Sequence, residues 1–113
     1  DTMTSAEITM KKFHSNYDIL LSPVLTSSPV KLGWLDMDCH NTKEYAERFA
    51  RYSGFCALYN ATGAPSMSVP AAVSVDKLPI GALFSACNGN DLLLLQLASQ
   101  LELAFPWPSV API

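Results

Sequence analysis

The stretch that decides the fold is residues 66–84, SMSVPAAVSVDKLPIGALF, in which two apolar runs flank a short turn. The first run covers residues 66–73 and the second covers residues 78–84, with Val75-Asp76-Lys77 between them. Short apolar runs bounded by turn residues are typical of β-strands that are neighbours in a sheet. We therefore predict a β-hairpin or an adjacent pair of strands here.

Upstream of these strands, residues 41–60 form the clearest amphipathic helix in the first half of the sequence. Asn41-Thr42-Lys43-Glu44 supplies a helix start. Apolar and aromatic side chains then recur at spacings of three and four residues: Tyr45, Phe49, Tyr52, Phe55, Cys56 and Tyr59. Gly63 is expected to end this helix as a left-handed cap, and Pro65 prevents its continuation.

Three further elements are expected towards the ends of the chain. Residues 5–17 predict a helix, and residues 18–25 predict a short buried strand that ends near Pro23, because proline cannot donate to a strand ladder. Residues 26–33 form a Ser/Pro-rich loop. A last helix is expected over residues 92–103, capped by Asn90 or Asp91 and ending before Pro106.

The resulting order is helix, strand, helix, strand, strand, helix, which predicts an α/β fold with a sheet covered by helices. The strands are apolar on both faces, as expected for strands between two helix layers. Three strands and three helices cannot cover both faces and both edges of such a sheet, and open edges invite further strand pairing. The pattern alone therefore favours a piece of a larger sheet.

The composition supports the same interpretation. The 113 residues suffice for one domain or part of one. Half of them are hydrophobic and 15% are charged, against roughly 25% in a typical soluble domain. A surface that other protein covers would explain this excess of apolar residues.

Charge, hydropathy and cysteine usage exclude several partners. The net charge of −3 gives no electrostatic support for nucleic-acid binding. No stretch approaches the roughly 20 apolar residues of a membrane span, and no signal peptide is recognisable at the start. The three cysteines, Cys39, Cys56 and Cys87, show no zinc-like spacing. They are expected to be free buried thiols, which indicates a reducing, cytoplasmic location.

No residue pair in the sequence predicts catalysis or metal binding. Nucleophilic catalysis needs a nucleophile within hydrogen-bond reach of a base. Cys39 and His40 are adjacent, and on an extended backbone their side chains point apart. His14 lies on a helix near two lysines, and Asp36-Met37-Asp38 lacks the spacing of a calcium loop. We therefore assign no catalytic residue, no metal ligand and no cofactor.

Four stretches, in order, resemble the amidase-signature family. Residues 60–70, NATGAPSMSVP, resemble its N-x-T-G-x-P-A-x-S-V-P run, and Leu78-Pro79-Ile80-Gly81 resembles its L-P-I-G strand. Gly89-Asn90-Asp91-Leu92-Leu93 is similar to its G-D-E-x-L-L helix entry, and residues 17–23, YDILLSP, to its Y-D-x-L-L-T-P strand. The closing Pro106-Trp107 resembles bacterial members similar to 6-aminohexanoate cyclic-dimer hydrolases.

This resemblance implies that residues 1–113 are the C-terminal fragment of one amidase-signature domain, with a mixed β-sheet covered by helices. Family members hydrolyse amides with a Ser–cis-Ser–Lys triad in a Gly/Ser-rich segment further upstream. Nothing here corresponds to that segment. The chain alone is therefore expected to be inactive, with the amide substrate and the N-terminal part of the domain as its partners. Whether the parent forms a homo-oligomer is left open.

The resemblance also implies one wall of a substrate pocket. The helix before the N-x-T-G run is similar to one that faces substrate in related enzymes. Phe49, Tyr52, Ser53 and Cys56 share one face of that predicted helix by their spacing. The competing interpretation is that this face belongs to the ordinary core.

Two other functions are weighed against an amide hydrolase. One is a glutamine amidotransferase subunit, which an acidic residue at position 53 would have favoured; the sequence has Ser53. The other is a non-catalytic interaction module whose open strands a partner or a second copy would pair.

Overall fold

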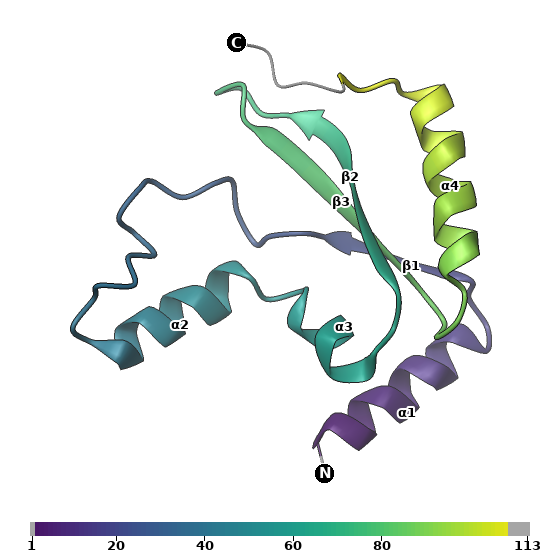
Figure 1. Cartoon of the computed structure of the whole chain (residues 1–113), viewed down its shortest axis with the longest axis horizontal. Helices are drawn as coiled ribbons and strands as arrows, with labels where there is room; N and C mark the ends of the chain where they lie inside the picture. Colours follow the sequence, from purple (N-terminus) through teal and green to yellow (C-terminus); the bar gives the residue numbers. More distant parts are fainter. Residues whose placement is uncertain (1, 109–113) are drawn as a thin grey trace.

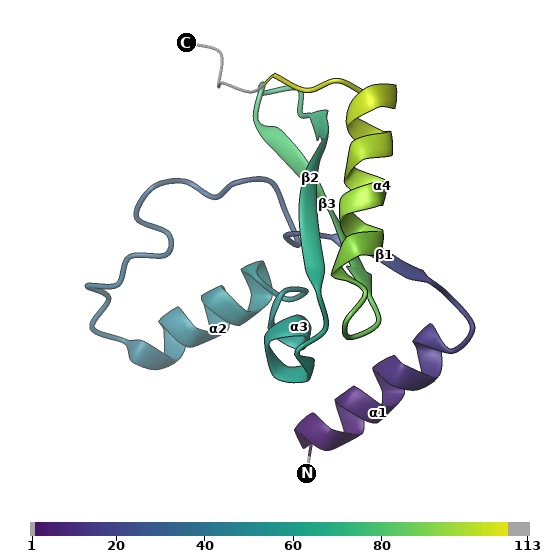
Figure 2. The same ribbon diagram turned by 45° about the vertical axis from the view of Figure 1, so that its right-hand side comes forward.

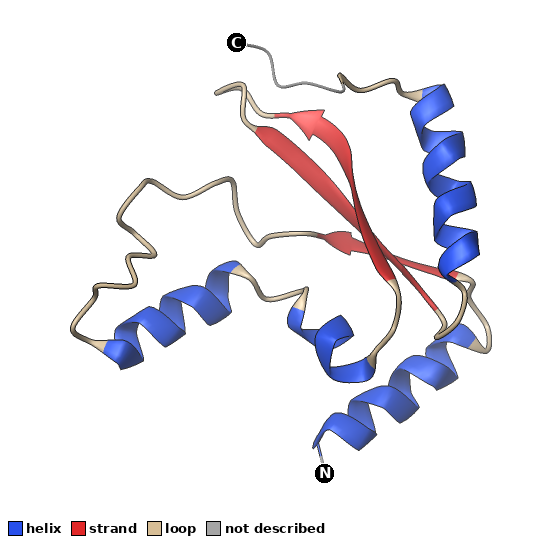
Figure 3. Ribbon diagram, in the orientation of Figure 1, coloured by secondary structure: helices blue, strands red, loops and turns tan. Residues whose placement is uncertain are grey.

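A computed structural model of the chain describes residues 2–108. Its strands are β1 (Ile19–Pro23), β2 (Ser66–Val73) and β3 (Pro79–Ala86). Its helices are α1 (Thr2–His14), α2 (Thr42–Tyr52), α3 (Ala57–Thr62) and α4 (Asp91–Ala104). Figure 3 shows these elements coloured by type. The α/β class and the positions of all three strands are confirmed.

The three strands form one sheet in the order β1-β3-β2, and both pairings are antiparallel. The predicted neighbours β2 and β3 do pair, with a register shift between Pro70 and Ala72. Pro70 is tolerated because β2 is an outer strand, where a missing N–H costs no ladder bond. Within the described residues, β1 and β2 each leave one edge open (Figure 1).

Helices α1, α3 and α4 pack against the sheet, and α2 lies to one side of it (Figure 1). Leu83 of β3 joins a core with Met10 of α1, Tyr59 of α3 and Ala64. Neighbouring residues in a strand point to opposite faces. The other face carries Val69, whose partner in the register is Ala82, and α4 packs along β2 and β3, as Figure 2 shows.

The predicted single helix over residues 41–60 is wrong, because the structure has two helices with a break at residues 53–56. Ser53 caps the C-terminus of α2: its backbone N–H and its Oγ both donate to the carbonyl of Phe49, at 2.9 Å each. Gly54 follows, and glycine is among the poorest helix formers. Together they end α2 at Tyr52, eleven residues before Gly63.

The other helix boundaries shift by a few residues. The first helix ends at His14 instead of residue 17, because Ser15 Oγ and Asn16 Nδ2 both donate to the Lys12 carbonyl and so compete with a further turn. Within α1 the Glu7 carboxylate accepts a hydrogen bond from Lys11 Nζ at 2.7 Å and raises the pKa of that ammonium. Gly63 has the expected left-handed conformation, with φ of 66°.

The chain is open and flat for its size. It measures 44 × 43 × 18 Å, with a radius of gyration of 16.3 Å against about 13 Å for a compact chain of this length. Its accessible surface is 8545 Å², whereas a compact monomer of this mass exposes about 6,100 Å². The fold therefore leaves much of its apolar surface uncovered.

Candidate functional site

The site of interest is a hollow where the loop after β1 meets the C-terminal end of α2. It has a volume of about 510 Å³ and is lined by Thr26, Ser27, Val30, Trp34, Arg51 and Tyr52. We call it the Trp34 hollow. A smaller hollow of about 310 Å³, between residues 23–29 and residues 79–81, shares Thr26 and Ser27 with it.

Thr26 ties the end of β1 to the end of α2. Its N–H donates to the Tyr52 carbonyl at 3.2 Å, and its Oγ1 donates to the Arg51 carbonyl at 2.6 Å. These bonds satisfy carbonyls that the last turn of a helix otherwise leaves without a partner. The floor of the hollow is thus fixed by the backbone of α2.

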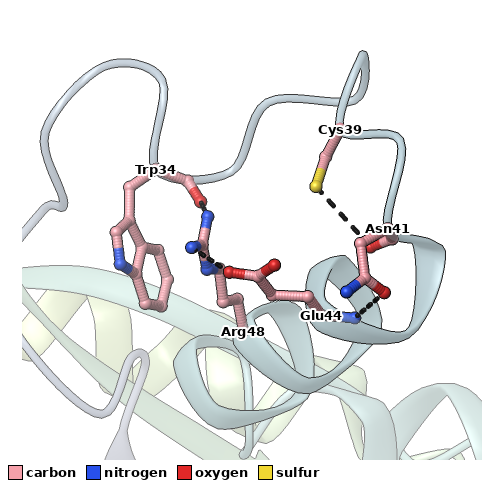
Figure 4. Close-up of polar contacts among 5 residues, drawn as sticks. All are labelled: Trp34, Cys39, Asn41, Glu44 and Arg48. Carbon is pink, nitrogen blue, oxygen red and sulfur yellow. Dashed lines mark hydrogen bonds and ion pairs between the residues drawn. The ribbon is translucent and has the colours of Figure 1, made fainter.

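The far wall is held by Arg48. Its guanidinium lies over the Trp34 indole, 5.7 Å from the ring centroid, and its Nη1 donates to the Trp34 carbonyl at 3.2 Å. Its Nη2 pairs with Glu44, as Figure 4 shows. Because Arg48, Arg51 and Tyr52 are spaced at i, i+3 and i+4, they share one face of α2. That face of α2 contacts the loop after β1 at Trp34.

Two aromatic rings meet at the hollow. The Trp34 and Tyr52 rings lie edge to face, with centroids 6.2 Å apart and an interplanar angle of 70°. Arg51 adds a guanidinium. Among residues 2–108 the Arg51 side chain has no ion-pair or hydrogen-bond partner.

The four predicted pocket-wall residues belong to two helices: Phe49, Tyr52 and the cap Ser53 to α2, and Cys56 to the start of α3. Tyr52 lines the hollow, whereas Phe49 is exposed and stacks on Tyr45 at 6.2 Å. Ser53 caps α2, and Cys56 packs against the core, with its Sγ 3.7 Å from the Val24 carbonyl oxygen. Their common face was inferred from one continuous helix, and the break at residues 53–56 separates Cys56 from the other three. Their contact with substrate stays a prediction.

The other polar candidates have local structural roles. The Asp36 carboxylate accepts from the N–H of Asp38 at 2.9 Å, and Cys39 Sγ lies 3.5 Å from the Asn41 carbonyl oxygen. His14 Nδ1 lies 3.0 Å from the Tyr17 carbonyl oxygen. Among the described residues no group of three or more His, Cys, Asp or Glu side chains could hold a metal ion.

The three cysteines are free, as expected, but each is half-buried rather than buried. None of the helices among residues 2–108 combines the length and the apolarity that crossing a bilayer requires.

Sequence reasoning missed Trp34, Arg51, Thr26 and Ser27 as neighbours of Tyr52. The i, i+3, i+4 spacing of Arg48, Arg51 and Tyr52 was visible in the sequence. The position of the loop that these side chains contact could not be predicted, because its sequence contains no signal for contact with α2.

Comparison with known proteins gives consistent matches. The family model described as Amidase matches residues 2–95. The chain is 35% identical over 99 residues to "Putative amidase AmiC" of Mycobacterium tuberculosis, covering 88% of this chain and 20% of that protein. It is 34% identical over 106 residues to the 6-aminohexanoate-cyclic-dimer hydrolase of Paenarthrobacter ureafaciens, covering 88% and 21%.

The fold is also similar to a solved structure of 6-aminohexanoate cyclic dimer hydrolase. The TM-score is 0.81 at 29% identity, over 95% of this chain and 23% of that one. The chain therefore spans about a fifth of the length of these relatives.

Proposed function

The chain belongs to the amidase family, and on that premise we propose that residues 1–113 are the C-terminal fragment of a single amidase-signature domain in an enzyme that hydrolyses linear amides. Such a reaction adds water across the carbon–nitrogen bond and yields a carboxylic acid and an amine. The support is twofold: a close structural match over nearly the whole chain, and a fold that is open on its own.

The observation that carries this proposal is the apolar surface that the chain leaves uncovered. Leu21 of β1 is 60% exposed, and Leu92 and Leu95 of α4 are 66% and 64% exposed. Burying such a side chain contributes about 1.5–3 kcal/mol, so exposing several is costly. The open edges of β1 and β2 add unpaired backbone groups. A surrounding amidase domain would cover both.

In this proposal the chemistry belongs to the rest of the domain. The nucleophilic serine, the cis-serine and the lysine of the family lie outside the residues matched here, so the mechanism would be acyl transfer through an acyl-enzyme formed elsewhere. Residues 1–113 supply part of the sheet and one wall of the substrate pocket, where Phe49, Tyr52, Ser53 and Cys56 are the candidates. The chain alone is then inactive.

The proposed partners follow from the same premise. They are a small amide substrate and the N-terminal part of the domain, and a homo-oligomer of the complete enzyme is compatible with both. The three free thiols support a cytoplasmic location.

Neither alternative function gains support. The relatives reported above are named as amidases or as hydrolases of a cyclic amide dimer, not as amidotransferase subunits. Ser53 uses its hydroxyl to cap α2. For a free-standing interaction module, the exposed leucines and open strand edges would have to be covered by a separate protein.

A paired assay tests the proposal. Residues 1–113 and the full-length protein that carries them are expressed separately and incubated with hexanoyl 4-nitroanilide and with hexanamide. We expect hydrolysis by the full-length protein and none by the segment. Hydrolysis by the isolated segment, or a full-length protein that cleaves no amide in a broad panel, would contradict it.

A cooperative melt of the isolated segment as a monomer provides a second check. A well-folded monomer would show that the exposed leucines need no covering protein, which would contradict the fragment interpretation.

A further inference from the structure

The Trp34 hollow contains a positive charge that the described part of the chain does not neutralise. Arg48 is engaged by Glu44 and by Trp34. Arg51 lies three residues later on the same face of α2 and lines the hollow. Glu47 lies one turn before Arg51, but the two form no ion pair in the described residues. Within residues 2–108, the exposed guanidinium of Arg51 therefore has no counter-ion.

The rest of the lining suits a chain that ends in a carboxylate. The rings of Trp34 and Tyr52 provide flat apolar surface, and Thr26 and Ser27 add polar lining. Guanidinium groups match the geometry of carboxylates and are favoured for recognising them. The volume of about 510 Å³ falls within the range of small-molecule sites.

The negative end of the α2 dipole does not prevent this. The last carbonyls of a helix carry the partial negative charge that would repel an anion. Here the carbonyls of Arg51 and Tyr52 accept hydrogen bonds from Thr26, and the carbonyl of Phe49 accepts them from Ser53. Each of these carbonyls therefore has a donor within the protein, and the guanidinium is the charged group that lines the hollow.

Hydrogen bonds and a cation–π contact hold both walls of the hollow in place. Arg48 holds Trp34 through both its ring and its carbonyl. Thr26 fixes the opposite side through two carbonyls of α2. A site with positioned walls loses less conformational freedom when it binds a ligand.

We propose that the Trp34 hollow is a subsite for the carboxylate end of the substrate. This inference rests on the proposed function, and it names the substrate class: amides whose chain ends in a carboxylate, which Arg51 pairs with while the chain lies against the rings of Trp34 and Tyr52. A neutral amide of the same length loses the charged hydrogen bonds and keeps the ring contacts.

The test uses the full-length protein and two matched substrates, the mono-4-nitroanilide of adipic acid and hexanoyl 4-nitroanilide. Both release 4-nitroaniline, and only the first has a terminal carboxylate. We expect kcat/KM to favour the carboxylate substrate by about ten- to a hundredfold, the range of one hydrogen bond to a charged group. Arg51→Gln should lower kcat/KM for the carboxylate substrate more than for the neutral one and so abolish that preference, while Arg51→Lys should retain part of it.

Lys43→Gln is the matched control, because it removes the same charge from the first turn of α2, about 12 Å along the helix axis from Arg51. It should leave the preference unchanged. Binding of hexanoate and of hexanamide, measured by calorimetry, gives a readout that does not need turnover. We expect tighter hexanoate binding in the wild type and no difference in Arg51→Gln.

The outcomes separate this inference from the proposed function. If both anilides are cleaved equally well, or if Arg51→Gln leaves the preference intact, the subsite is wrong and the amidase proposal stands. If the full-length protein cleaves no amide at all, both the proposed function and the subsite are wrong.

Discussion

The Arg48 guanidinium lies 5.7 Å from the centroid of the Trp34 indole and donates a hydrogen bond to the Trp34 carbonyl at 3.2 Å (Figure 4). One side chain of α2 thus holds both the ring and the backbone of a loop residue fourteen positions earlier. Glu44 pairs with the same guanidinium from one turn before. The Trp34–Tyr52 ring contact and the Thr26 hydrogen bonds also position this loop, so Arg48 is one of three links between it and α2.

Replacing Arg48 by Gln should loosen that loop. A cation–π contact at an exposed site contributes about 0.5–1 kcal/mol, which corresponds to roughly two- to fivefold faster exchange of the loop amides. Hydrogen exchange read by mass spectrometry over residues 30–40 measures it. Lys43→Gln is the charge-matched control, and equal exchange in both variants would show that Arg48 does not hold the loop.

The two asparagines that cap helices should differ in importance. Asn41 Oδ1 accepts a hydrogen bond from the N–H of Glu44 at 3.2 Å, while the Asn90 side chain makes no cap bond to α4. Asn41→Ala should destabilise α2 by about 1 kcal/mol, and Asn90→Ala should cost distinctly less. Amide exchange of the first turn of each helix measures this. A larger loss at Asn90 would contradict the assigned caps.

Gly81 is expected to tolerate no side chain. A Cβ at this position would lie 2.8 Å from Val24 Cγ2 and 3.0 Å from Ser68 Oγ. Overpacking of this kind typically costs about 1–3 kcal/mol. Gly54 is the matched control, because a Cβ there meets Thr26 Cγ2 at an ordinary 3.5 Å.

Denaturant unfolding of the Gly81→Ala and Gly54→Ala variants of the full-length protein compares the two sites. Only the first should lower the midpoint. An unchanged midpoint in Gly81→Ala would mean that β3 can move away from Val24.

How far the sequence predicts this fold depends on the range of each signal. Local sequence signals predicted local structure correctly. Asn41 caps the start of α2, Gly63 is the left-handed cap of α3, and a short turn joins β2 to β3. The missed break at residues 53–56 also had a local signal, Ser53-Gly54 inside the predicted helix. The regular aromatic spacing across it outweighed that signal, although those aromatics belong to two separate helices.

Long-range contacts were not predictable in this way. In the pairing of β1 with β3, Ile19 lies opposite Ala86, although the two residues are far apart in the sequence. The residue pattern of neither strand predicts which strand it pairs with. The Trp34 hollow depends on the same kind of contact, since Thr26 meets α2 from 25 residues away. The amidase resemblance identified the family, but it did not place these side chains.

The exposed leucines of α4 give a prediction about stability. The loss of unfolding free energy in Leu95→Ala should differ between a protein in which α4 is uncovered and one in which the rest of the domain covers it. In the structure Leu95 is 64% exposed and Gln96 beside it is also exposed. If nothing else covers α4, Leu95→Ala should change the free energy of unfolding by no more than about 0.5 kcal/mol. If the rest of an amidase domain covers it, the same change in the full-length protein should cost about 2–5 kcal/mol.

We expect the larger loss, with Gln96→Ala as the neighbouring control that stays close to the wild type. Denaturant unfolding of the full-length variants measures both. The isolated segment should respond in the opposite direction: Leu95→Gln removes apolar surface from water-exposed α4 and should reduce aggregation, measured by light scattering. A small effect in the full-length protein would place Leu95 on its outer surface, and the covered-face argument would then have to rest on Leu21 and the open strand edges alone.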